Sequence, residues 1–267
     1  MDGTTLFYHD ERSRLVGADY VGRRERQHRF LDPAGNIYKH ADGSDRRYGK
    51  GGVLLEAEGT KYAYDNDGNV ILKELPNGER WKYLWNGAGR LTEVWKPDGS
   101  RVTFKYDALA RRVEKAVFDQ GVKEPRSRVR WVWDGNAPVH ELLNDELSTW
   151  LFEPGRFAPI ALFRSDDVQG YVPDHLGVPR QSFDRTGTRI WNQYLDTFGS
   201  RHAAENISFP WRWPGQYADD ETGAVYNRFR YYDPAEGRYL SQDPIRLLGG
   251  PKLYGYVDDP LTCGDLF

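Results

Sequence analysis

Adjacent residues Asp174 and His175, in the stretch DHLGVPR, are of types that could do chemistry together. A carboxylate beside an imidazole is typical of an oriented general base, and the two groups could also bind a metal ion. Successive side chains on a strand point to opposite faces, so these two would not converge on one ion. We therefore predict a structural role for the pair.

The remaining candidates for chemistry are one thiol and three short runs. Cys263 is the only cysteine, so no internal disulfide can form, and its place near the C-terminus argues against a buried catalytic thiol. The glycine-rich runs GKGG (49–52) and LLGG (247–250) lack the Lys-Ser/Thr of a phosphate loop and indicate turns. The basic run RRERQHR (23–29) could hold phosphates, but the net charge of −3 favours a solvated strand or loop.

The composition points to a globular all-β protein with short strands. Among 267 residues, enough for one large domain or two small ones, 17 Tyr and 9 Trp favour strands, while 28 Gly and 15 Pro imply many turns. No apolar run approaches the ~20 residues that cross a bilayer, and the N-terminus lacks a signal-peptide pattern. The residues contain no nuclease, deaminase or ADP-ribosylating constellation, so we do not expect the chain to be a toxin by itself.

An internal repeat explains the turns. The segments YDNDGNVI (64–71), WNGAGRLT (85–92) and YDALARRV (106–113) align without gaps at a spacing of 21 residues, which makes the period a basic feature of the fold. In the third copy Ala110 takes the Gly position and Arg112 takes an apolar position. The second residue of each copy is Asp or Asn, whose side-chain oxygen can accept hydrogen bonds from the following turn. We predict an architectural role for these residues.

The stretches between the repeats predict β-hairpins. Asn77-Gly78 and Asp98-Gly99 are hairpin dipeptides, because both residues can adopt positive φ at low cost. Large apolar residues alternate with polar ones after each turn, which places them on one face of a sheet. The expected buried face contains Trp81, Tyr83, Trp85, Val102, Phe104, Tyr106, Val129, Trp131 and Trp133; the opposite face contains Arg80, Lys82, Arg101, Thr103 and Lys105. Stacked hairpins of this kind form one winding antiparallel sheet.

The repeat resembles the YD repeat of Rhs and teneurin-like proteins. The chain from DHLGVPR (174–180) to GQYADDETGAVYNRFRYYDPAEGRYLSQDPIRLLGGPKLYGY (215–256) resembles the Rhs-associated core more specifically. The resemblance implies YD/RHS repeats over residues 1–140 and a repeat-associated core, truncated at its end, over residues 141–267. It also implies an all-β fold in which antiparallel hairpins wind into a curled sheet, part of a hollow β-cocoon shell.

The resemblance further implies a non-enzymatic shell that encloses a C-terminal toxin for interbacterial competition, exported through a type VI secretion apparatus or a related complex. The expected partners are a toxin domain, absent from this chain, other Rhs shell segments, and secretion spike or adaptor proteins. No cofactor, metal, nucleic acid or membrane span is expected, and the protein would be cytoplasmic in the producing bacterium before export. The aromatic ladders leave an alternative open, a carbohydrate-binding surface, which would expose a row of Trp rings where a shell would bury them.

The family's shell cuts its own chain by aspartyl chemistry after a P-x-x-x-x-D-P-x-G-L motif. On this resemblance the catalytic pair maps to Asp243, in SQDPI, and Asp265, with Asp233 and Asp259 as less favoured candidates. Two carboxylates that share a proton can activate water and protonate the leaving group. Here Asp265 is followed by Leu266-Phe267 and no Pro-x-Gly-Leu, so we expect a vestigial pair in an orphan or truncated core. A residual aspartyl self-cleaving protease is the alternative.

A short run of repeats also carries an expectation about the sheet's edges. We expect the first strands to leave an unpaired edge, because the visible repeats are too few to close on themselves. The result would be an open curled sheet, marginally stable alone, that associates with itself or with another piece of shell.

Overall fold

The computed structural model describes residues 5–20, 25–165, 167–201 and 209–265. One antiparallel sheet of fifteen strands, in the unbroken order β20 to β6, dominates the fold. Its strands are β6 (Arg46–Tyr48), β7 (Leu54–Ala57), β8 (Thr60–Tyr64), β9 (Val70–Glu74), β10 (Arg80–Trp85), β11 (Leu91–Trp95), β12 (Arg101–Tyr106), β13 (Arg112–Phe118), β14 (Ser127–Asp134), β15 (Ala137–Leu143), β16 (Glu146–Phe152), β17 (Pro159–Arg164), β18 (Asp167–Pro173), β19 (Pro179–Asp184) and β20 (Arg189–Asn192). The predicted antiparallel curled sheet is confirmed.

The described residues also form three smaller sheets. They comprise β1 (Thr5–His9), β2 (Leu15–Tyr20) and β3 (Glu25–His28); β4 (Phe30–Leu31) with β5 (Ile37–Tyr38); and β21 (Tyr217–Asp219), β22 (Ala224–Asn227), β23 (Arg230–Asp233) and β24 (Arg238–Tyr239). The two glycine-rich runs lie in 3-10 turns, η2 (Lys50–Gly52) and η3 (Arg246–Gly249), as predicted.

The curl of the large sheet follows from a bulge that recurs at the leading aromatic of each repeat. The pairing register shifts at Tyr64 between β8 and β9, at Trp85 between β10 and β11, and at Tyr106 between β12 and β13. A β-bulge bends its strand and increases the local right-handed twist. A bend repeated in every second strand turns a long ribbon into a curl.

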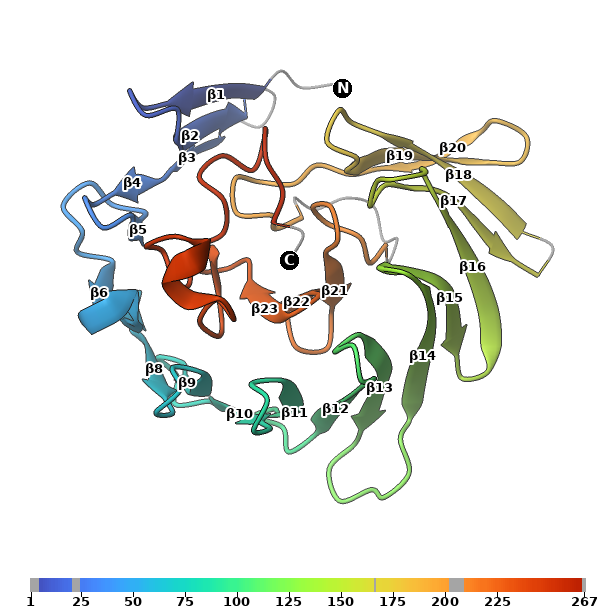
Figure 1. Ribbon diagram of the computed structural model, residues 1–267, viewed down its shortest axis with the longest axis horizontal. Helices are drawn as coiled ribbons and strands as arrows, with labels where there is room; N and C mark the ends of the chain where they lie inside the picture. The colour runs from blue at the N-terminus through green and yellow to red at the C-terminus, as the bar shows by residue number, and fades with distance from the viewer. Residues whose placement is uncertain (1–4, 21–24, 166, 202–208, 266–267) are drawn as a thin grey trace.

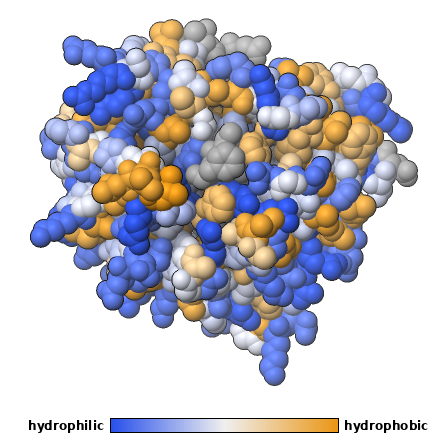
Figure 2. Space-filling model, viewed as in Figure 1, coloured by the Kyte–Doolittle hydropathy of each residue, from blue (hydrophilic) through white to orange (hydrophobic). Residues whose placement is uncertain are grey.

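The inner face of the curl is covered by the chain's own C-terminal part, which we name the inner segment (residues 209–265). Figure 1 shows β21, β22 and β23 inside the arc that β6 to β20 describe. The predicted apolar face packs there: Tyr83, Phe104 and Trp131 are nearly fully buried in one core cluster with Tyr226 and Tyr231. Arg80, Lys82 and Lys105 are exposed on the opposite face, as predicted. Figure 2, which has the view of Figure 1, shows hydrophilic side chains interspersed with hydrophobic ones on this side of the molecule.

The hairpin dipeptides form turns, but with one difference from the prediction. Gly78 and Gly99 have φ of 86° and 78°, whereas Asn77 and Asp98 do not adopt positive φ. The side-chain oxygen of Asn77 instead accepts a hydrogen bond from the backbone N–H of Glu79, 3.0 Å away. Only one left-handed residue is therefore needed in each turn.

The sheet of β1, β2 and β3 contacts the residues that follow β20, the last strand of the large sheet. The backbone N–H of Thr197, just after β20, donates a hydrogen bond to Gln27 of β3, and Gln27 Nε2 donates to Asp196 at 2.9 Å. Among the described strands β1 pairs only with β2, which leaves one long side of β1 unpaired, as expected. The sequence division at residue 140 falls inside β15, and it stays a prediction.

Candidate functional site

Asp243 and Asp265 are joined by one arginine. Nη1 of Arg230 lies 3.2 Å from Asp243 Oδ2, and its Nη2 donates to Asp265 Oδ2 at 2.5 Å. The Arg230 side chain is 3% exposed, and those of Asp243 and Asp265 are 15% and 17% exposed. The two predicted site residues therefore share one guanidinium in a largely dehydrated place.

Several elements of the inner segment position Asp243 and Asp265, which we name the acid pair. Arg230 begins β23 and lies with its guanidinium carbon 3.8 Å from the ring centre of Tyr239 on β24. The Tyr239 hydroxyl donates to Asp265 Oδ2 at 2.8 Å, and the Nδ2 of Asn227 donates to the Asp265 carbonyl at 3.0 Å. Burial first, and the charge of Asp265 next, raise the pKa of Tyr239, so the hydroxyl keeps the proton that it donates.

Asp243 begins a tight turn, closed by a hydrogen bond from the Arg246 N–H to the Asp243 carbonyl, four residues after the end of β24. One of its carboxylate oxygens accepts a hydrogen bond from the backbone N–H of Ile245 at 2.9 Å. A cleft of about 260 Å³ opens beside it, between two repeat turns of the sheet and the inner segment. Its lining includes Asn69, Arg90, Phe229, Gln242 and Arg246. The acid pair thus combines a buried arginine with one carboxylate that borders a cleft.

The less favoured candidates have other partners. Asp233 accepts a hydrogen bond from Lys73 Nζ at 2.9 Å and one from the backbone N–H of Ala235. Asp259 lies 3.0 Å from His9 Nε2 and also accepts the backbone N–H of Leu261. These contacts give both residues a structural role. Within the described residues, neither of them contacts Arg230.

The repeat aspartates and Asp174 are architectural, as predicted. Oδ1 of Asp65 accepts the backbone N–H groups of Asp67 and Asn69, at 3.0 and 2.8 Å. Asp174 does the same for the turn that follows it and also pairs with Arg180. Asp174 and His175 lie in the turn between β18 and β19 and not on a strand, so their expected placement on a strand was wrong; His175 is exposed, and its Nε2 contacts the Leu261 carbonyl at 2.8 Å.

One part of the basic run departs from the expectation. Residues 25–28 form a strand, as one alternative allowed, and the exposed Arg26 pairs with Asp19. Arg29, however, is 4% exposed and donates a hydrogen bond from Nη1 to the Thr197 carbonyl at 3.1 Å. Its charge anchors the first strands to the residues after β20 and is not solvated. Residues 21–24 lie outside the described ranges.

The residue that sequence reasoning missed is Arg112 on β13. It is 1% exposed, forms an ion pair with Asp219 of the inner segment, and lies over the rings of Trp131 and Tyr226 at 4.5 and 4.3 Å. The signal in the sequence was an arginine in an apolar repeat position. Such a residue, on a face that is buried elsewhere, requires a buried carboxylate.

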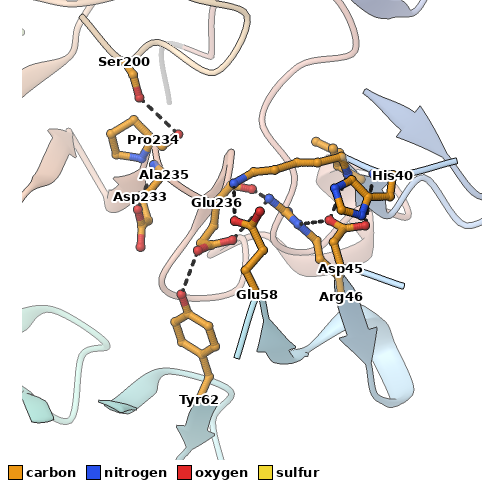
Figure 3. Close-up of polar contacts among 12 residues, drawn as sticks. His40, Asp45, Arg46, Glu58, Tyr62, Ser200, Asp233, Pro234, Ala235 and Glu236 are labelled. Carbon is orange, nitrogen blue, oxygen red and sulfur yellow. Dashed lines mark hydrogen bonds and ion pairs between the residues drawn. The ribbon is translucent and has the colours of Figure 1, made fainter. Parts of the chain in front are cut away.

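Arg112 belongs to a wider pattern of ion pairs between the sheet and the inner segment. The sheet supplies the cations and the inner segment the carboxylates: Arg112 and Lys115 with Asp219, Lys115 with Glu221, Lys73 with Asp233, and Arg46 with Glu236. Figure 3 shows one of these contacts, where Arg46 and Tyr62 approach Glu236 from the sheet. We name this set the inner ion pairs. They fix the position of the inner segment within the curl.

The described residues contain no group of three or more His, Cys, Asp or Glu side chains that could hold a metal ion. Cys263 is a free, exposed thiol. Within the same part of the chain, no helix is long and apolar enough to cross a membrane.

A long antiparallel sheet that winds round the chain's own C-terminal part defines a repeat-built β-shell. The chain belongs to the teneurin YD-shell family, whose model matches residues 3–247. Its relatives include Rhs proteins, which confirms the resemblance seen in the sequence.

Three curated relatives illustrate the similarity. The chain is 31% identical to double-stranded DNA deaminase toxin A of Burkholderia cenocepacia, over 98% of this chain and 20% of that protein. It is 34% identical to toxin protein Tse5 of Pseudomonas aeruginosa (74% and 18%) and 33% identical to the probable deoxyribonuclease RhsA of Dickeya dadantii (81% and 16%). The chain therefore spans about a fifth or less of the length of these relatives.

Solved structures share the fold. The crystal structure of TcdB2-TccC3-Cdc42 superposes with a TM-score of 0.58 at 18% identity, over 98% of this chain and 18% of that one. That of TcdB2-TccC3-TEV gives 0.57 at 17% identity, with the same coverage. Both structures therefore share the fold of this chain, which covers 18% of the length of each.

Proposed function

We propose that this chain forms the wound, C-terminal part of a β-shell that encloses a toxin carried on the same polypeptide. Three relatives named as toxins or as a probable deoxyribonuclease support the proposal, since each contains a region like this chain within a much longer protein. The partners would be the toxin domain and further shell segments. Spike or adaptor proteins would serve export from the producing bacterium in competition with other bacteria.

The observation that carries the proposal is the place of Asp265. The inner segment lies inside the curl (Figure 1), and Asp265 is held there by Arg230, Tyr239 and Asn227. A polypeptide that continues from this point would therefore begin on the inside of the sheet. A toxin domain that follows this chain could then lie inside the shell, because the connecting polypeptide would not have to cross the sheet.

The burial of the aromatic ladders supports a shell over a carbohydrate-binding platform. Of the tryptophans, Trp131, Trp150, Trp191, Trp211 and Trp213 are at most 5% exposed, and Trp95 is the only one among the exposed large apolar residues of the described ranges. A stacking platform needs several rings open to solvent in a row. These rings instead pack on one another and on the inner segment.

A protease-accessibility experiment tests the enclosure. A short linker carrying the recognition sequence of a specific protease is added after Phe267 in one version and before Met1 in another. We expect the linker after Phe267 to be cut several-fold more slowly, because Asp265, the last described residue before it, is held inside the curl. Equal cleavage rates at the two ends, with the fold of both versions verified by circular dichroism, would contradict the proposal.

A second candidate activity is self-cleavage at the acid pair, because Arg230 brings the carboxylates of Asp243 and Asp265 to one place. One ionised carboxylate would take a proton from water, the water oxygen would attack the scissile carbonyl carbon, and the other carboxyl would protonate the leaving amide nitrogen. Arg230 would act as a positioning residue that keeps both carboxylates within reach of one water. The cleft beside Asp243 leaves room for an extended peptide.

The test of self-cleavage supplies a bond to cut. Leu266 and Phe267 are replaced by Pro-Ala-Gly-Leu followed by a reporter domain, and the intact mass is measured over time. We expect release of the reporter after the new leucine, and its loss in Asp243→Asn and Asp265→Asn; Asp145→Asn, at an exposed carboxylate between β15 and β16 of the sheet, serves as the matched control that still cleaves. A stable mass in the extended protein would refute the activity and leave the shell proposal untouched.

A further inference from the structure

One of the two glycine-rich runs that the sequence marks as turns, GKGG (49–52), lines a cavity. It has a volume of about 290 Å³ and lies between residues 34–37, residues 48–52 and the inner segment. Gly49, Gly51 and Gly52 line one side, and Pro251 with Gly255 line the other. Backbone therefore forms much of the wall, and only a few side chains reach the space.

Most of the charged side chains that line this cavity are neutralised by a partner. Glu236 is bound by Arg46, whose Nη2 lies 3.2 Å from Oε2, and by the Tyr62 hydroxyl, which donates to Oε1 at 3.1 Å (Figure 3). Lys252 forms an ion pair with Asp258. Neither of these two charges is left over for a ligand.

Arg238 is the exception. It lines the cavity, is 8% exposed, and lies over the ring of Tyr254 at 4.6 Å. Nη2 donates to the Gly52 carbonyl at 2.8 Å, while Nε is buried without a hydrogen-bond partner. In the part of the chain that the structure describes, Arg238 forms no ion pair with a carboxylate. By contrast, Arg46 and Arg112, the buried arginines of the inner ion pairs, each do.

A buried guanidinium without a counter-ion is unfavourable, because the lost hydration of the charge must be replaced by an opposite charge. Arginine presents a planar array of donors that matches the two oxygens of a phosphate or a carboxylate. We propose that Arg238 and the glycine-rich walls form a binding site for a small oxyanion, a phosphate or carboxylate group. The site is separate from the acid pair and does not depend on the proposed function.

Calorimetric titration of the intact chain with pyrophosphate and with malonate tests the site. We expect saturable binding of at least one probe, and the tighter of the two identifies the oxyanion as phosphate or carboxylate. Arg238→Gln should weaken binding about ten- to hundredfold, because a charge-assisted hydrogen bond is lost. Arg47→Gln, which removes an exposed arginine paired with Glu56, is the matched control and should bind as before.

A second pair of variants keeps the test independent of the stability of Arg238→Gln. Gly51 is exposed, has φ of 71°, and a Cβ added to it would meet nothing within 4 Å. Asp and Asn both tolerate this left-handed conformation. Gly51→Asp places a negative charge at the cavity wall and should weaken binding, whereas Gly51→Asn adds the same bulk and should not. Absence of saturable binding of both probes, or equal binding by Gly51→Asp and Gly51→Asn, would overturn the proposal.

Discussion

Arg112 on β13 and Asp219 on β21 form a buried ion pair across the interface between the large sheet and the inner segment, with Nη1 2.5 Å from Oδ2. Burial alone would lower the pKa of Arg112, but the charge of Asp219, the hydrogen bond to it and the nearby Tyr231 and Tyr226 together more than offset this, so the net shift is upward. The guanidinium therefore stays charged within a group of aromatic rings. The two residues are 107 positions apart in the chain.

We predict that Arg112→Met destabilises the protein by about 3–5 kcal/mol, because it leaves the charge of Asp219 buried with only Lys115 as a partner. The free energy of unfolding in urea, followed by tryptophan fluorescence, measures the effect. Arg130→Met removes an exposed arginine paired with Asp145 and should change stability by less than about 0.5 kcal/mol. Similar losses for the two variants would show that the buried pair does not stabilise the inner segment.

The role of the repeat aspartates in their turns predicts that two substitutions of Asp107 lower the stability by different amounts. Its Oδ1 accepts the backbone N–H groups of Leu109 and Arg111, and Oδ2 accepts Arg111 Nε at 2.7 Å. Asp107→Ala should cost about 1–3 kcal/mol, since these donors lose their acceptor, whereas Asp107→Asn should cost less. Asn86 already occupies the matching position of the preceding repeat with the same backbone contacts. Thermal unfolding by circular dichroism would rank the two variants, and an equal cost for both would contradict the turn's dependence on the acceptor.

Stability should fall in acid through carboxylates with depressed pKa. The Arg14 side chain holds the pKa of Asp10 at about 2, and Arg26, helped by Tyr8, holds that of Asp19 at about 2. A folded-state pKa below the unfolded value of about 3.9 gives stability that is fully present above pH 4 and is lost as the pH falls towards 2. NMR titration of the two carboxyl groups measures these values directly. Midpoints near 4 in the folded protein would contradict the prediction.

Two glycines with similar φ should respond differently to alanine. Gly237 has φ of 71°, and a Cβ added to it would overlap the Phe198 ring; Gly78 has φ of 86° and open space around it. Gly78→Ala should cost about 1–2 kcal/mol, from backbone strain alone. Gly237→Ala should cost about 1–3 kcal/mol more, because the core must also move. Urea unfolding compares the two, and equal losses would mean that the ring yields freely.

The features that the sequence predicted correctly are those encoded within a few residues. The Asx contact of Asp65 with Asn69 and the turn at Gly78 each join residues at most four positions apart, so the local sequence contains all of their partners. Alternation along β10 and β12 likewise predicted which side chains are buried, because the period of a strand is two. The positions of Asp243 and Asp265 came from the family resemblance and not from such local patterns.

The tertiary structure alone decided what covers the buried face and which charges meet there. Arg230 lies 35 residues from Asp265, and Arg46 lies 190 residues from the Glu236 carbonyl that it binds. No local pattern records such pairs, because they form only when the curl brings the inner segment against the sheet. The same holds for Arg112, Arg29 and Arg238: the sequence shows three arginines among many, and only the packed structure shows that water is excluded from them. Dehydration, set by the whole fold, makes the partner of each buried charge decisive.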